Sequence, residues 1–257
     1  MTLMVRSDLR RDGHHLRLVL DQPKGNLISR ALIGQLGRAL ADIADLAEVK
    51  LVTIEGAGDH FSYGASVEEH RPEIIGEALP EFHALIRELL AVPAPTAAIV
   101  RGRCLGGGFE IALACDLLFA GTTAVLGVPE IALGVFPPAA SVLLPLRVGT
   151  SRAASVILSG EPRPVDDWAG TGLVELTAPP EELEVAVDHW FDAHLAARSA
   201  AALGYAALAC RSATRKQVEA VLPELERLYL DTLMSTHDAA EGIAAFLEKR
   251  QPVWRHA

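Results

Sequence analysis

Two glutamates, Glu110 and Glu130, stand twenty positions apart and are the residues best suited by type and setting to do chemistry. Glu110 follows Gly106-Gly107-Gly108-Phe109, and Glu130 follows Gly127-Val128-Pro129. A glycine run that opens a helix exposes backbone N–H groups, which can receive a developing oxyanion. Two neighbouring carboxylates can hold different protonation states, one as base and one as acid. These parts together suit the addition of water to an activated double bond.

The glycine triplet has other interpretations. A dinucleotide fingerprint is excluded because the G-x-G-x-x-G spacing is missing, and a P-loop because no Gly-Lys-Ser/Thr follows. A tight structural turn remains open, as does simple stabilisation of a helix N-terminus by the Glu110 carboxylate. Apolar neighbours such as Phe109 and Ile111 favour a buried carboxylate, whose raised pKa would suit a general base near neutral pH.

The composition limits the function classes. The chain has 257 residues, is 50% hydrophobic and carries a formal charge of −10, without any block rich in lysine and arginine. We therefore expect no nucleic-acid partner. The three cysteines lack metal-ligand spacing, and no apolar signal segment stands at the N-terminus, so a cytoplasmic location is expected. Prolines interrupt the longest uncharged run, residues 131–146, so we expect no membrane span.

The apolar periodicity predicts strands that alternate with helices, followed by a helical C-terminal region, as in an α/β protein. Strands are predicted at 16–20, 50–55, 96–100 and 116–120. Helices are predicted after the N-cap Ser29 and at 79–90, 111–115, 181–195, 199–210, 214–232 and 238–251. We expect residues 1–190 to form the core with the site, and residues 191–257 to form a helical oligomerisation region.

The histidines do not form a metal-binding pattern. His83 is expected on a helix surface, and His14-His15 in an exposed turn. The segment Glu68-Glu69-His70 has two open interpretations, a solvated loop or the mouth of an acyl pocket.

Several motifs resemble the crotonase, or enoyl-CoA hydratase/isomerase, family over nearly the whole chain. They lie in family order at Asp21–Leu27, Phe61–Ser66, Gly102–Asp116, Gly127–Gly134 and Ala240–Arg250. The resemblance implies a spiral of ββα units with a helical C-terminal trimerisation region, assembled as a homotrimer or homohexamer. It also implies an acyl-CoA thioester substrate. Coenzyme A would be part of that substrate, and no cofactor or metal would be needed.

The resemblance also implies roles for individual residues. The thioester carbonyl would lie between the backbone N–H groups of Ala65 and Gly107. Glu110 would activate water as the base, and Glu130 would donate a proton. The other residues expected to contact the acyl group or coenzyme A are Lys24, Tyr63, Gly64, Ser66, Gly106, Pro138 and Lys249, with Arg250 as an alternative to Lys249.

The chain departs from the common family pattern near the acyl pocket. Ser66 replaces the usual aspartate, Tyr63 stands where a small residue is common, and Pro137-Pro138 replaces a glycine-rich segment. The loop Phe61–His70 and the segment Phe136-Pro137-Pro138 resemble a branch that hydrates a cyclic dienoyl thioester in anaerobic benzoyl-CoA degradation. Such a reaction adds hydroxide at the carbon β to the thioester and a proton at the far end of the diene. A straight-chain enoyl-CoA hydratase, an isomerase or a ring hydrolase remain alternatives; non-enzymatic binding of a CoA ester or RNA is disfavoured.

Overall fold

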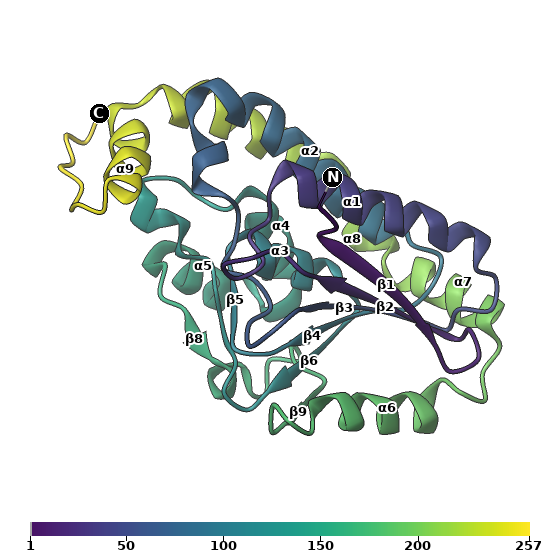
Figure 1. Ribbon diagram of the computed structural model, residues 1–257. Helices are drawn as coiled ribbons and strands as arrows, with labels where there is room; N and C mark the ends of the chain where they lie inside the picture. Colours follow the sequence, from purple (N-terminus) through teal and green to yellow (C-terminus); the bar gives the residue numbers. More distant parts are fainter. Residues whose placement is uncertain (1) are drawn as a thin grey trace.

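A six-stranded sheet forms the centre of the computed structural model, which describes residues 2–257, with the side chains at 44 and 45 excepted (Figure 1). Its strand order is β1-β2-β3-β4-β6-β9. The strands are β1 (Val5–Arg10), β2 (His15–Leu20), β3 (Leu51–Gly56), β4 (Thr96–Val100), β6 (Leu117–Gly121) and β9 (Leu176–Ala178). β1 and β2 form an antiparallel hairpin, and every later pair is parallel, as expected where helices connect successive strands.

A smaller sheet brings the two candidate glutamates to one place. It consists of β5 (Arg103–Leu105), β7 (Val125–Gly127) and β8 (Arg163–Pro164). β5 and β7 are parallel, with Leu105 paired to Gly127. The segment with Glu110 follows β5 and the segment with Glu130 follows β7. Because parallel neighbours end at the same edge of a sheet, both segments start side by side.

Helices cover both faces of the larger sheet. The helices in chain order are α1 (Arg30–Ala41), α2 (Pro72–Ala91), α3 (Gly107–Ala114), α4 (Pro138–Val148), α5 (Thr150–Ser159), α6 (Leu183–His194), α7 (Ala200–Cys210), α8 (Ser212–Arg227) and α9 (His237–Leu247). In Figure 1, α1, α2 and α8 lie over one face and α6 lies under the other, while α9, in yellow, lies at one end of the molecule. No helix within residues 2–257 combines the length and apolar character needed to cross a bilayer.

The alternation of side chains along β4 divides the core in two. Ala98 and Val100 belong to the main cluster, with residues of α1 to α4 and α8. Ala97 and Ile99 face α6, where Phe191 is among the packed side chains. Successive strand residues point to opposite faces, so one strand serves both clusters.

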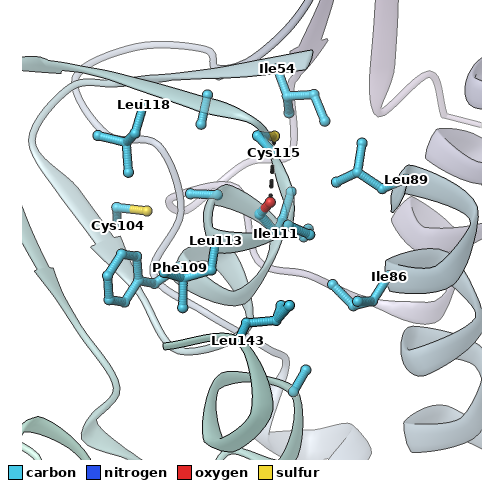
Figure 2. Close-up of a cluster of buried hydrophobic side chains, with 14 of the residues drawn as sticks. Ile54, Ile86, Leu89, Cys104, Phe109, Ile111, Leu113, Cys115, Leu118 and Leu143 are labelled. Carbon is cyan, nitrogen blue, oxygen red and sulfur yellow. Dashed lines mark hydrogen bonds between the residues drawn. The ribbon is translucent and has the colours of Figure 1, made fainter. Parts of the chain in front are cut away.

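Helix α3 is buried on every side, which fixes the residues at its N-terminus. Phe109, Ile111 and Leu113 are at most 2% exposed. Figure 2 shows them inside a cage of neighbours that includes Ile86 and Leu143. Burying a side chain of this size contributes about 1.5–3 kcal/mol. The Glu110 backbone is therefore set in the rigid centre of the protein.

Most predicted elements are confirmed, including β4 and the helices after β9. Ser29 caps α1 as expected, its hydroxyl accepting from the Leu32 N–H at 3.4 Å. β1, α4 and α5 were not predicted, and α2 begins at Pro72 rather than near 79. The division of function at residue 190 stays a prediction.

Candidate active site

Glu110 and Glu130 line one cavity. Ala65, Gly107 and Pro138 line it too. Most of the wall is apolar, and its side chains come from α1, α2, the segment before α4 and the turn after α8. The lining residues are Ile28, Ile33, Ala65, Ser66, Glu69, His70, Ile75, Ala78, Leu79, Phe82, Gly107, Glu110, Glu130, Phe136, Pro137, Pro138 and Tyr229.

Glu110 lies in the first turn of α3 and is 5% exposed. Its Oε1 accepts a hydrogen bond of 2.7 Å from the backbone N–H of Ala140. Ala140 lies in the first turn of α4, which Pro138 opens, so the positive end of this helix faces the carboxylate. Burial raises the pKa of Glu110 to about 7, and the N–H groups of Ala140 and Ala139 limit the rise.

Glu130 lies in a short 3-10 helix, η3 (Pro129–Leu133), directly after β7. The residue as a whole is half-buried, but its Oε2 is out of contact with solvent and has no hydrogen-bond partner in the described part of the chain. Burial, and next the charge of Glu110, raise the pKa of Glu130 well above its ordinary value. Glu110 is therefore the first of the two to ionise as pH rises, and Glu130 keeps its proton.

Ala65 and Gly107 line the same cavity, and their backbones lie close together. Ile28 pairs with Ala65: the Ile28 N–H donates to the Gly64 carbonyl at 2.9 Å, and the Ser66 N–H donates to the Ile28 carbonyl at 3.1 Å. In such a parallel bridge the Ala65 N–H points away from Ile28. A Cβ added at Gly107 would lie 3.5 Å from the Ala65 nitrogen. The first N–H groups of α3, which have no partner within the helix, thus lie beside that of Ala65.

The glycines of the triplet serve different purposes. Gly106 has φ +50°, and a Cβ there would lie 2.7 Å from Glu130 Oε1. Gly108 packs on Ser62, whose Cβ would be only 2.5 Å from an added methyl group. Gly106 therefore makes room for the acid, whereas Gly108 permits close packing of α3.

A second cavity adjoins the first and shares Ala65, His70 and Glu130 with it. Besides the shared Ala65 and Glu130, four residues predicted from the sequence line the second cavity: Tyr63, Gly64, Gly106 and Arg250, the alternative to Lys249. Helix α9 and the segment after it complete the wall through Gly242, Phe246, Arg250 and Pro252.

The predicted contacts therefore divide between the two cavities. Ser66 and Pro138 line the first cavity, with the glutamates. Lys24 and Lys249 are exposed and lie outside the linings of both cavities. Their contact with the coenzyme A phosphates stays a prediction.

The structure corrects two histidine predictions. His83 is 0% exposed rather than on the surface, and its Nδ1 lies 2.6 Å from Glu226 Oε2 on α8. His15 is 3% exposed, begins β2 rather than lying in a turn, and its Nε2 lies 2.9 Å from Thr53 Oγ1. Both polar rings are buried beside a polar partner, which the sequence pattern did not reveal.

Some site residues were not predicted at all. The Ala140 N–H and the Tyr229 side chain both come from segments between the recognised motifs Gly127–Gly134 and Ala240–Arg250. Each of the two interpretations of residues 68–70 holds for part of the segment. Glu69 and His70 line the first cavity, whereas Glu68 is exposed.

Comparison with known proteins decides the family. A family model described as enoyl-CoA hydratase/isomerase matches residues 16–257. The chain belongs to the enoyl-CoA hydratase/isomerase family. It is 44% identical over 250 residues to a cyclohexa-1,5-dienecarbonyl-CoA hydratase of Thauera aromatica. The match covers 96% of this chain and 95% of the relative. A 2,3-dehydroadipyl-CoA hydratase of Escherichia coli is 34% identical over 92% of this chain and 93% of its own.

Structural comparison gives the same family. An enoyl-CoA hydratase from Mycobacterium avium subsp. paratuberculosis K-10 matches with a TM-score of 0.86 and 30% identity, covering 99% of each chain. The predicted fold class, an α/β crotonase-like spiral with a helical C-terminal region, is confirmed.

Proposed function

We propose that this family member is an acyl-CoA hydratase whose preferred substrate is cyclohexa-1,5-diene-1-carbonyl-CoA. Its product would be 6-hydroxycyclohex-1-ene-1-carbonyl-CoA, in anaerobic benzoyl-CoA degradation. The observation that carries the proposal is the pair of carboxyl groups that line one cavity, with Glu110 held by the Ala140 N–H and Glu130 Oε2 buried without a partner in the described part of the chain. The similarity to the Thauera aromatica hydratase supports the choice of acyl group.

The backbone pair of Ala65 and Gly107 would bind the thioester oxygen. When a nucleophile adds to the conjugated system, negative charge moves onto that oxygen. Each N–H donor directed at such an oxyanion contributes about 3 kcal/mol to stabilising the transition state. The closeness of the two backbone groups supports this role, because a single oxygen can accept from both.

Glu110 and Glu130 would divide the proton transfers. The Glu110 carboxylate removes a proton from water while hydroxide bonds to the ring carbon β to the thioester. The electrons of that double bond move to the thioester oxygen and then form a new double bond on the other side of the α carbon. The Glu130 carboxyl gives its proton to the far end of the diene. Transfer of the proton from Glu110 to Glu130 restores the starting state, and the net addition is one water.

The walls of the first cavity suit a compact ring. Leu79, Phe82 and Phe136 offer apolar contacts. Pro138 at the first position of α4 has no N–H to leave unpaired against an apolar ring. The second cavity, between Tyr63 and α9, would hold the chain that leads to the coenzyme A nucleotide.

The remaining expectations belong to the same proposal. The enzyme would need no resident cofactor or metal, because general acid–base chemistry and backbone donors suffice for the addition. We propose a cytoplasmic homotrimer or homohexamer, with residues 191–257 as the oligomerisation region. Lys24 and Lys249 would contact the coenzyme A phosphates.

Steady-state kinetics with two substrates test the proposal. The purified enzyme should hydrate cyclohexa-1,5-diene-1-carbonyl-CoA with a higher kcat/KM than crotonyl-CoA. Glu110→Gln should lower kcat by about 10²–10⁴, the usual contribution of a general base. A higher kcat/KM for crotonyl-CoA would favour the straight-chain alternative. Hydration of neither substrate would contradict the proposal.

A further inference from the structure

Tyr229 is a buried side chain that the proposed reaction does not use. It is 1% exposed and lines the cavity that contains Glu110 and Glu130. Its hydroxyl oxygen has no hydrogen-bond partner within residues 2–257. Burial, and then the charges of Glu130 and Glu110, raise the pKa of the Tyr229 hydroxyl. The group therefore keeps its proton at neutral pH and remains available as a donor.

The surroundings of this hydroxyl are apolar. Tyr229 packs in a cluster with Ile75 and Leu79, and its ring meets Phe136 edge to face with centroids 5.5 Å apart. An unpaired buried hydroxyl destabilises a folded protein, so a bound molecule that supplies an acceptor there gains affinity. The cavity thus offers one neutral donor beside two carboxyl groups.

The segment that carries Tyr229 is held at both ends of α8. Arg211, just before the helix, donates to the carbonyls of Val92 and Ala94 at 2.7 Å each. Near the other end, Glu226 pairs with the buried His83 of α2. Tyr229 follows in a π-helical turn, Leu228–Thr232, a local widening that occurs often at functional sites. The anchoring supports a defined position for the hydroxyl.

On the basis of the proposed function, we propose that the Tyr229 hydroxyl donates a hydrogen bond to the oxygen that water adds to the acyl group. The thioester oxygen is already assigned to Ala65 and Gly107. The coenzyme A chain is assigned to the second cavity, whose lining does not include Tyr229. Glu130 Oε2 and the Tyr229 hydroxyl both lack a partner in the described part of the chain, so they are not bonded to each other. The oxygen introduced by hydration is the acceptor that remains. Tyr229 is then a specificity residue that favours a hydroxyacyl thioester over the same ring without the hydroxyl.

Binding measured by calorimetry tests the contact. Glu110→Gln serves as the background, because it should prevent turnover during the measurement. In this background, 6-hydroxycyclohex-1-ene-1-carbonyl-CoA should bind about tenfold more tightly than cyclohex-1-ene-1-carbonyl-CoA, as one added hydrogen bond predicts. Adding Tyr229→Phe should abolish the difference and leave the affinity for the ring without the hydroxyl unchanged.

Tyr205→Phe is the matched control, because Tyr205 lies on α7 and is 77% exposed. It should keep the tenfold preference. The melting temperature of Tyr229→Phe should be unchanged or higher, since only an unpaired hydroxyl is lost. A preference that persists in Tyr229→Phe, or a lower melting temperature, would overturn the proposal. Tyr229→Phe could abolish the preference in a protein that hydrates neither the dienoyl nor the enoyl substrate. That result would support the contact and contradict the hydratase function.

Discussion

Glu110 is buried by the fold and then partly stabilised as an anion. The apolar cage of α3 favours the neutral carboxyl, whereas the N-terminus of α4 favours the carboxylate. These opposing effects leave its pKa at about 7. A base with this pKa is ionised in a useful fraction near neutral pH and still accepts a proton readily.

Activity should therefore rise with pH. The kcat/KM for hydration should increase as pH passes about 7, because Glu110 must lose its proton before it can activate water. A pH–rate profile of the wild-type enzyme measures this directly. The residual activity of Glu110→Gln should lack this inflection. An inflection near 4.5 in the wild type, the ordinary value for glutamate, would contradict the role of burial.

The same shift predicts how stability depends on pH. Between pH 4.5 and about 7, folded Glu110 holds a proton that the unfolded chain has lost. Folded protein then binds more protons, so the free energy of unfolding falls as pH rises through this window and stays lower above it. The shift corresponds to about 3 kcal/mol.

Glu110→Gln should accordingly be up to about 3 kcal/mol more stable than wild type at pH 8, and the difference should vanish below pH 4.5. Urea unfolding at several pH values measures it. A destabilised Glu110→Gln protein at pH 8 would show that the carboxylate is a structural group instead.

Single residues were predictable where short motifs identify them and not where a contact joins distant segments. Glu110 and Glu130 follow glycine or proline bends, which the sequence shows plainly. The Ala140 N–H is a backbone group, so no side chain signals its bond to Glu110. Tyr229 lies in a stretch whose periodicity predicts only a helix. His83 was expected on an exposed helix face, but that face packs against α8, where Glu226 and Glu219 pair with His83 and Arg87.

At the scale of elements, the start of α3 combines a packing requirement with a chemical one. A methyl group at Gly108 would collide with Ser62, which cannot move easily because its hydroxyl bonds to the Asn26 carbonyl at 2.7 Å and the Gly64 N–H at 3.0 Å. A methyl group at Gly107 would make only ordinary contacts of 3.5 Å, but next to the Ala65 nitrogen.

The two alanine substitutions should therefore separate stability from activity. Gly108→Ala should lower the free energy of unfolding by about 1–3 kcal/mol through overpacking. Gly107→Ala should unfold like wild type but lose about 10²–10³ in kcat, because the methyl group intrudes on the oxyanion site. Urea unfolding and steady-state kinetics on both variants supply the data. Full activity in Gly107→Ala would contradict the proposed oxyanion site.

Helix α8 should depend on Arg211 for its attachment to the sheet. This side chain is 4% exposed, pairs with Asp116 and donates to two backbone carbonyls. Arg211→Met should lower the free energy of unfolding by about 3–5 kcal/mol, since Asp116 and the carbonyls lose their partner. Arg215→Met, at an exposed position on the same helix, should change it by about 0.5 kcal/mol or less. Equal losses in both variants would refute this anchoring role.

Helices and strands with a regular apolar periodicity were predictable from the sequence. Elements whose conformation depends on their tertiary contacts were not. The helix at α1 has a polar cap and a regular apolar stripe, so both its start and its buried face follow from the sequence. Helix α4 was not predicted because its segment contains prolines at 137, 138 and 145, although proline is well tolerated in the first turn of a helix. β1 is an edge strand and is polar over most of its length. It therefore lacks the apolar run from which a strand would be predicted.

At the scale of the whole molecule, the topology explains how distant motifs form one site. The parallel pair β5–β7 brings the two glutamate segments to one edge, and the bridge between Ser62 and Cys104 holds the loop with Ala65 beside β5. Helix α9 packs closely against η3. A side chain at Gly242 of α9 would collide with the Leu133 carbonyl of η3. The C-terminal region, at one end of the molecule in Figure 1, thereby completes the second cavity.

Oxygen incorporation is the most direct test of the central claim that paired carboxyl groups add water to a thioester-conjugated double bond. The purified enzyme would be incubated with cyclohexa-1,5-diene-1-carbonyl-CoA in water enriched in heavy oxygen, and the acyl product analysed by mass spectrometry. We expect one heavy oxygen atom in the acyl group, incorporated about 10²–10⁴ times more slowly by Glu110→Gln and by Glu130→Gln than by the wild type. A product that forms without heavy oxygen, or incorporation by both variants at the wild-type rate, would contradict the account.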